Sequence, residues 1–128
     1  MKFKTKLISK KYDYVAKDGS ECRLLLGLKN GDLAHFTLHS KTTSKAITHK
    51  SVEEIWYFIQ GEGEVWRKRG QQQETAKVMP GVCITIPLGT HFQFRNTGRK
   101  PLRFIIFCTP PWPGSQEAKD VKGHWEVS

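Results

Sequence analysis

The sequence predicts an all-β fold, and three observations favour that prediction. Short apolar runs alternate with glycine, proline and asparagine, and they recur about every 8–12 residues, a spacing typical of sandwiches and barrels. No convincing helical period occurs before Ser115. Hydrophobic residues make up 38% of the 128 residues, a share that suits a small barrel with half-exposed strands better than a helical bundle.

Nine segments are rich in β-branched and aromatic residues and are bounded by turn signals, so each is expected to form a strand. The expected strands are residues 22–28, 32–39, 45–49, 55–60, 64–68, 76–78, 82–86, 92–95 and 102–109. Residues 115–121 are expected to form one short turn of helix.

Turn residues separate these segments. Asn30 and Gly31 are a strong hairpin signal, because both residues tolerate a positive φ angle. The Gly-Glu-Gly segment at 61–63 links two strands in the same way, and further turns are expected at 80–81 and 96–98.

The segment from Glu54 to Gln60 is apolar on both faces of its expected strand. Successive side chains of a strand point to opposite sides, so Trp56 and Phe58 share a face with Glu54. The opposite face carries Ile55, Tyr57 and Ile59. A strand that is apolar on both faces is typically covered on both, within a barrel or at a dimer interface.

The net charge of +9 raises the question of an anionic partner. The basic residues are scattered, no run of five like charges occurs, and no helix-turn-helix, zinc-finger or RRM signature is present. We therefore expect a lysine-rich surface and consider nucleic-acid binding unlikely. The charge could instead draw an anionic small substrate towards a cleft.

Length and apolar content predict one domain without a membrane partner. No apolar run approaches the ~20 residues of a membrane span, and the first residues lack the apolar core of a secretory signal. The chain has 3 cysteines, widely spaced; Cys83 and Cys108 lie in apolar runs and are expected to be buried small hydrophobes. We expect a reduced, cytoplasmic protein.

The stretch around residue 50 resembles the first motif of the cupin superfamily, G-x5-H-x-H-x3/4-E-x6-G. Glu54 and Gly61 have the spacing of the glutamate and the final glycine, and His49 stands at the second histidine. The fit covers the later part of the motif.

A later stretch is similar to the second cupin motif, G-x5-P-x-G-x2-H-x3-N. Gly81, Pro87, Gly89 and Asn96 match it in spacing. Together the two motifs cover about residues 30–110. The chain also looks like the small single-domain bacterial cupins that end in Pro-Pro-Trp-Pro-Gly, here residues 110–114.

The resemblance implies one cupin domain over residues 1–128, in which N-terminal strands and a C-terminal tail pack on the barrel. The implied fold is a double-stranded β-helix, an antiparallel jelly-roll barrel that is often dimeric. It also implies a pocket in the barrel, usually with Fe, Mn, Ni or Zn held by three His and one Glu. Members include dioxygenases, isomerases, epimerases, cyclases and non-enzymatic binders.

Two positions depart from the motifs. The first histidine of the pair falls on Ile47, and the histidine of the second motif falls on Phe92, one residue after His91. Because one residue exchanges the faces of a strand, Phe92 and Phe94 are expected in the core, with His91 on the other side. His91 would turn inward if the preceding loop, 87–90, were bulged.

The candidate metal ligands are therefore His49, Glu54 and His91, since two histidines and a carboxylate form a known Fe(II) set. For each, the alternative is a structural role: a pocket-edge or surface imidazole, or a strand-end carboxylate. Trp56, Phe92, Phe94 and Gln93 are candidates for a substrate pocket, with ordinary barrel core as the alternative.

The leading hypothesis is a cupin that binds a small organic molecule, with one divalent metal (Fe, Mn, Ni or Zn) and a possible isomerase, cyclase or dioxygenase activity. The alternative is a metal-free cupin that binds or senses a small ligand without catalysis. A homodimer is expected from the resemblance, and catalytic residues are not assigned.

Overall fold

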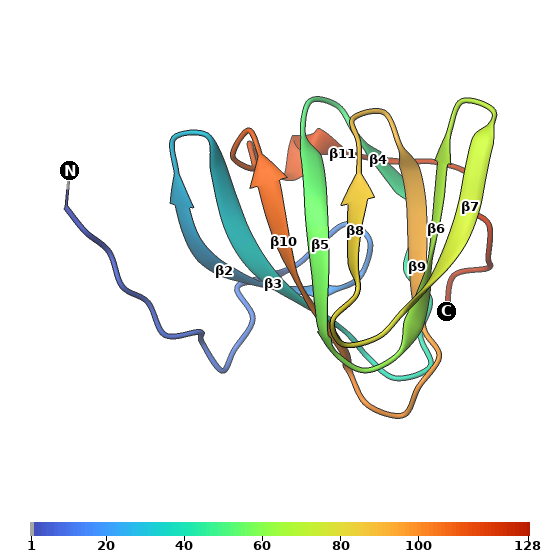
Figure 1. Cartoon of the computed structure of the whole chain (residues 1–128), viewed down its shortest axis with the longest axis horizontal. Coiled ribbons are helices and arrows are strands. Elements are labelled where there is room, and N and C mark those ends of the chain that lie inside the picture. Colours follow the sequence, from blue (N-terminus) through green and yellow to red (C-terminus); the bar gives the residue numbers. More distant parts are fainter. Residues whose placement is uncertain (1) are drawn as a thin grey trace.

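Two antiparallel β-sheets face each other in the computed structural model, which describes residues 2–128 (Figure 1). The first sheet contains six strands, in the spatial order β1 (Tyr14–Val15), β2 (Glu21–Leu28), β3 (Gly31–Leu38), β10 (Leu102–Thr109), β5 (Glu53–Gln60) and β8 (Cys83–Ile86). The second contains five, in the order β11 (Ala118–Asp120), β4 (Ile47–His49), β9 (His91–Asn96), β6 (Gly63–Arg69) and β7 (Gln72–Val78). The all-β prediction is confirmed.

The nine expected strands correspond to β2 to β10, with the largest difference in β7. That strand begins at Gln72, four residues earlier than expected, because its polar first half pairs with the end of β6. Arg67 and Glu74 face each other there and form an ion pair. Polar cross-strand pairs of this kind extend a hairpin without an apolar signal.

The short elements at the two ends differ from the expectation. β1 and β11 have two and three residues and join the sheets by backbone pairing, so no apolar period marks them. The expected helical turn is a 3-10 turn over Ser115–Glu117, after which the chain becomes extended and pairs with β4.

The core lies between the sheets, and β5 shows how alternation builds it. Trp56 and Phe58 are buried, and the ring of Trp56 stacks on Phe104 with centroids 4.9 Å apart. The opposite face of β5 remains exposed: Ile55 by 45%, Tyr57 by 48% and Ile59 by 40%. The division of this strand into two faces is confirmed.

The two motif turns at residues 41 and 61 have left-handed backbone. Gly61 has a φ of 86°, and a Cβ atom there would lie 2.7 Å from the carbonyl oxygen of Pro101. Only glycine therefore fits the turn between β5 and β6. Lys41 occupies the position of the first motif glycine and has a φ of 62°.

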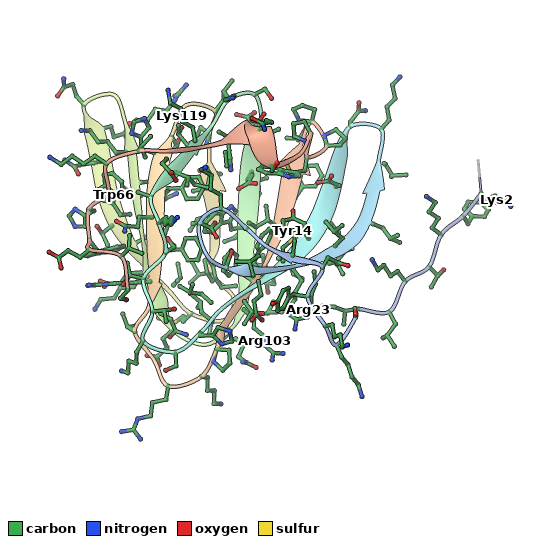
Figure 2. All side chains as sticks on the ribbon, turned by 180° about the vertical axis from the view of Figure 1, so that it is seen from behind. Lys2, Tyr14, Arg23, Trp66, Arg103 and Lys119 are labelled. Carbon is green, nitrogen blue, oxygen red and sulfur yellow. The ribbon has the colours of Figure 1, made fainter. Side chains whose placement is uncertain are left out.

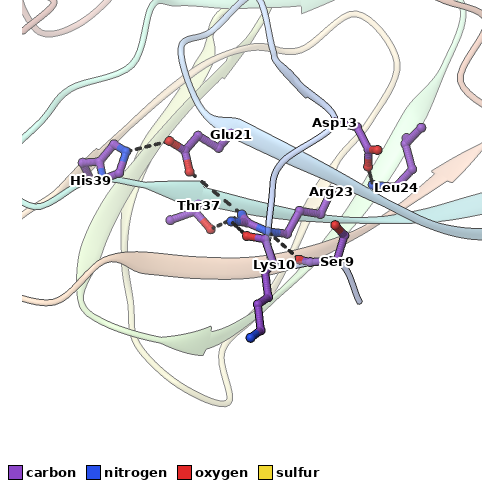
Figure 3. Close-up of polar contacts among 8 residues, drawn as sticks. All are labelled: Ser9, Lys10, Asp13, Glu21, Arg23, Leu24, Thr37 and His39. Atoms are coloured by element: carbon purple, nitrogen blue, oxygen red, sulfur yellow. Dashed lines mark hydrogen bonds and ion pairs between the residues drawn. The ribbon is translucent and has the colours of Figure 1, made fainter. Parts of the chain in front are cut away.

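The chain ends behave differently. The C-terminal segment packs on the outer face of the second sheet, where Trp125 lies under the guanidinium of Arg95 at 4.3 Å. The N-terminal segment extends away from the barrel (Figure 1), and Arg23 of β2 holds it by donating to the carbonyl oxygens of Ser9 and Lys10 (Figure 3).

Candidate functional site

A cavity of about 740 Å³ lies inside the barrel, between the two sheets. Hereafter it is called the barrel cavity. Strands from both sheets and the segment after β10 contribute to its wall, and Tyr14 of β1 (labelled in Figure 2) also lines it. Aliphatic and aromatic residues dominate that wall: Leu24, Leu25, Leu26, Phe36, Ile47, Trp56, Phe92, Ile106 and Trp112.

His49 is the last residue of β4 and lines the barrel cavity. Its ring lies between Phe92 and Trp112, with centroid distances of 5.2 and 5.3 Å. Among residues 2–128, no group is within hydrogen-bonding distance of its Nδ1 atom. Burial lowers the pKa of His49 to about 4, although the nearby Glu117 carboxylate opposes the shift. The imidazole is therefore neutral at physiological pH.

Glu54 points inward from β5 and also lines the barrel cavity. Its Oε1 atom accepts a hydrogen bond of 2.8 Å from Nε1 of Trp56. Burial raises the pKa of Glu54 to about 8, and the nearby carboxyl groups of Asp18, Asp32 and Glu117 raise it further, against the bond from Trp56. The side chain thus holds its proton at neutral pH unless a cation compensates its charge.

Glu117 organises the loop that joins His49 to Glu54. Its carboxylate accepts hydrogen bonds from the backbone N–H and the hydroxyl of Ser51 and from the backbone N–H of Val52. Burial raises the pKa of Glu117, but these bonds and the neighbouring His49 outweigh that effect, so its pKa is lowered. A charged Glu117 therefore fixes the two candidate residues relative to each other.

The four expected pocket residues fall into two groups. Trp56 and Phe92 line the barrel cavity, whereas Phe94 is fully buried core with no place in the cavity wall. Gln93 is on the opposite face of β9. Its side chain donates to the carbonyl oxygens of Ser44 and Trp125 and accepts from two backbone N–H groups of the C-terminal segment. Gln93 and Phe94 thus lie outside the wall of the barrel cavity, and the contacts described for them are structural.

The structure does not bring His91 together with His49 and Glu54. His91 is the first residue of β9, is half-buried, and pairs with Lys68 across the sheet. Phe92 points into the barrel, so its neighbour His91 points outward by the alternation of the strand. The loop before β9 does not reverse that register, so His91 lies apart from His49 and Glu54 in this structure.

The two other motif positions carry no ligand either. Ile47 and Phe92 are direct cross-strand partners and are both buried. In the described chain, 2–128, no group of three or more His, Cys, Asp or Glu residues is placed to hold a metal ion. His49 and Glu54 alone do not fit the three-His, one-Glu set, nor the two-His, one-carboxylate set.

Several cavity residues were not foreseen. Asp32 and Cys108 lie on β3 and β10, Asp18 precedes β2, and Trp112 comes from the proline-rich segment. Asp32 directly follows the Asn30-Gly31 turn, so the local sequence suggests a turn residue. Its place in the cavity wall becomes evident only from the arrangement of the strands. All 3 cysteines are free; Cys83 is exposed, in contrast to the expectation, because it points away from the barrel on edge strand β8.

Comparison with known families agrees with this architecture. Residues 34–108 match the family model of the cupin domain. The chain is also 33% identical over 119 residues to a protein of Methanocaldococcus jannaschii described as uncharacterized protein MJ1618, covering 84% of this chain and 90% of that protein. The chain therefore belongs to the cupin family.

Solved structures share the fold. BH2720 from Bacillus halodurans matches with a TM-score of 0.65 at 21% identity, covering 84% of this chain and 80% of that one. Oxalate decarboxylase from Lactobacillus farciminis matches with a TM-score of 0.70 at 18% identity, covering 88% and 33%. The capsular polysaccharide assembling protein CapF from Staphylococcus aureus matches with a TM-score of 0.70 at 13% identity, covering 91% and 34%. These likenesses establish the double-stranded β-helix fold.

No helix within residues 2–128 has the length and apolar character needed to cross a membrane.

Proposed function

We propose that this cupin binds a small organic molecule in its barrel cavity through direct contacts with His49 and Glu54, and without the metal set that the cupin motifs usually supply. The observation that carries the proposal is the wall of the cavity, where these two polar residues face inward and the other motif positions, Ile47 and Phe92, are apolar. This is the metal-free alternative of the two hypotheses from the sequence.

The size and lining of the cavity support a small-molecule ligand. Sites for such ligands typically measure about 300–1,000 Å³ and combine apolar walls with a few polar groups that fix orientation, and the barrel cavity has about 740 Å³. The half-buried Trp112 offers aromatic surface for an apolar body, whereas His49 and Glu54 offer hydrogen bonds.

The donor set gives no support to a metal-dependent isomerase, cyclase or dioxygenase. Such chemistry needs about three protein ligands around one ion, and His49 and Glu54 are the motif ligands that remain. We therefore place binding, rather than metal-dependent catalysis, at the centre of the proposal.

Two measurements test it. Metal analysis after anaerobic incubation with Fe(II), Mn(II), Ni(II) and Zn(II) is expected to find no stoichiometric metal. If the wild type binds stoichiometric metal and both His49→Ala and Glu54→Ala lose it, the metal-free part is overturned.

A fragment screen by ligand-observed NMR is expected to find ligands that no longer bind to Ala34→Phe, because Ala34 lines the cavity. The matched control is Ala76→Phe on β7, outside it. Equal loss or equal retention in both folded variants would overturn cavity binding.

We further propose a homodimer formed through the outer face of the first sheet. Neighbouring strands leave apolar side chains exposed there: Leu33, Ile55, Tyr57, Ile59 and Phe107. The N-terminal segment leaves the barrel from this same face, where Arg23 holds Ser9 and Lys10 (Figure 3).

The exposed N-terminal segment supports a second copy as the occupant. It projects beyond the barrel as far as Lys2 (Figure 2) and exposes Phe3 and Leu7 almost completely, by 104% and 90%. Across a two-fold axis, the apolar N-terminal segment of each copy can cover the apolar outer face of the other, so the surface is self-complementary. Light scattering is expected to show a dimer that Tyr57→Asp dissociates and the control Val127→Asp does not; a wild-type monomer at micromolar concentration would overturn this part.

The free thiols of Cys22, Cys83 and Cys108 support a reducing compartment, and we keep a cytoplasmic location as part of the proposal.

A further inference from the structure

We propose that the ligand of the barrel cavity is a small organic cation, an amine attached to an apolar body. This inference rests on the proposed binding function and names the chemical class of its ligand. It runs against the net charge of +9, which by itself points to anions.

Acidic groups dominate the polar part of the cavity wall. Asp18, Asp32 and Glu54 all line it. Lys17 is the basic residue of the wall, and its ammonium group lies 3.8 Å from a carboxylate oxygen of Asp120 on the exposed side. The interior thus offers carboxyl groups without an internal partner cation.

Each of these carboxyl groups has one oxygen engaged by the protein. Trp56 Nε1 donates to Oε1 of Glu54, the backbone N–H of Trp112 donates to Oδ2 of Asp32 at 2.9 Å, and Ser20 donates to Oδ1 of Asp18. These bonds orient the carboxyl groups and leave the second oxygen of each for a ligand. An ammonium group matches these oxygens, because it donates several hydrogen bonds.

His49 independently indicates a ligand with a hydrogen-bonding group. It is only 7% exposed and lines the same cavity, yet its Nδ1 atom has no hydrogen-bonding partner within residues 2–128. A buried polar atom without a partner is unfavourable and indicates a missing partner such as a ligand. A neutral imidazole has one nitrogen that accepts a hydrogen bond, which suits an N–H donor.

The aromatic walls fit the same ligand. Trp112 lines the cavity beside His49, with ring centroids 5.3 Å apart, and is half-buried, whereas Trp56 and Phe92 form the wall behind with only 1% of each side chain exposed. Aromatic faces attract cations as well as apolar groups, so they accommodate both the charged end and the body of an amine. An anion would meet the carboxyl groups and no arginine in the wall.

The acidic groups are spread over the cavity wall, and this arrangement favours an organic cation over a metal ion. Within residues 2–128 no three ligating side chains converge on one point, as a bound metal requires. An ammonium group needs no such convergence, because each of its N–H bonds can reach a different acceptor.

Calorimetric titration with three matched probes tests the inference: 2-phenylethylamine, 2-phenylethanol and 3-phenylpropanoate, at pH 7.5 with the full chain. The amine is expected to bind at least tenfold more tightly than the other two. Glu54→Gln is expected to weaken the amine about tenfold or more, since it removes a charge-assisted bond, and to leave the alcohol nearly unchanged. Glu74→Gln is the control, because Glu74 lies on β7 at the surface.

The outcomes distinguish the two levels of the proposal. Tighter binding of the alcohol or the carboxylate, or equal loss of amine and alcohol in Glu54→Gln, overturns the amine inference and leaves cavity binding standing. Failure of all three probes to bind, with the protein folded, overturns the amine inference, and failure of the fragment screen overturns the binding function itself. If Glu74→Gln weakens amine binding as much as Glu54→Gln does, the cation binds at the surface, and the inference is overturned as well.

Discussion

Ile47 of β4 and Phe92 of β9 are cross-strand partners, and both side chains are buried, with 3% and 1% of their surface exposed. They occupy the positions at which the two cupin motifs place histidines. The two missing ligands are therefore neighbours in space, although 45 residues separate them along the chain (92 minus 47). At the point where metal ligands would converge, the wall of the barrel cavity instead contains these two packed apolar side chains.

This relationship predicts that the double variant Ile47→His with Phe92→His gains a metal site. Together with His49 and Glu54 it would supply three His and one Glu. We expect stoichiometric Ni(II) or Zn(II) binding, measured by metal analysis, and a metal-dependent increase of the melting temperature. The variant without metal is expected to be less stable by about 3 kcal/mol or more, because it loses buried apolar groups.

The wild type is the control, since it lacks two ligands of the set. A metal-dependent rise of the melting temperature in the wild type equal to that of the double variant would contradict the prediction. A folded double variant without metal affinity would show that the four side chains do not converge.

Glu54 predicts a specific dependence of stability on pH. Its pKa is raised from 4.5 to about 8 in the folded chain, so the folded state holds the proton more firmly than the unfolded state. The stabilisation is complete below pH 4.5 and is lost as the pH rises towards 8. Glu54→Gln keeps an oxygen that accepts from Trp56 but cannot ionise. Between pH 5 and pH 9, the free energy of unfolding of Glu54→Gln is expected to rise relative to that of the wild type by about 4 kcal/mol.

Urea unfolding at several pH values measures this difference. The control is Glu53→Gln, because Glu53 is the exposed neighbour on the same strand. His49 acts in the opposite sense, since its pKa is lowered to about 4: its contribution is present above pH 6.5 and is lost as the pH falls, so it does not obscure the range above pH 7. A parallel pH profile of Glu54→Gln and the wild type would refute the assignment.

The carboxylate of Glu117 is predicted to hold the loop between β4 and β5. It accepts hydrogen bonds from Ser51 and Val52, and Glu117→Ala leaves those donors without a partner. We expect a loss of about 2 kcal/mol in the free energy of unfolding, together with faster amide hydrogen exchange at Ser51 and Val52. Gln116→Ala is the matched control, because Gln116 is exposed in the same turn. Unchanged exchange at Ser51 and Val52 would contradict the role.

The fold was predictable because its signals are local. Turn residues such as Gly61 are required by backbone geometry, with a φ of 86°, and alternation along β5 separates Trp56 from Tyr57 without knowledge of the partner strands. The motif spacing from Glu54 to Gly61 then indicated the topology of a double-stranded β-helix. The two-residue strand β1 could not be found, because backbone pairing alone creates it.

The candidate site was predictable only in part, because it depends on which residues meet across the barrel. His49, Glu54, Trp56 and Phe92 line the cavity as expected from their faces. Asp32 lies on another strand and has no local sign of a cavity role. The one-residue offset of His91 indicated correctly that Phe92 points inward; the bulge that would have reversed it is not present in β9, whose pairing with β6 is regular from His91 to Asn96.

Lys41 offers a last prediction, on stability. Its φ of 62° lies in the left-handed region, where a side chain costs about 1 kcal/mol relative to glycine, and it occupies the first glycine position of the cupin motif. Lys41→Gly is expected to raise the free energy of unfolding by about 0.5–1 kcal/mol, even though it loses an exposed bond from Nζ to the carbonyl oxygen of Thr97. Lys41→Ala, which loses the same bond but keeps the Cβ atom, should not be stabilised. Lys45→Gly, at an exposed position whose φ is not positive, should be destabilised because glycine gains freedom in the unfolded chain. Equal effects of Lys41→Gly and Lys41→Ala in thermal unfolding would show that strain at this φ does not limit the stability of the barrel.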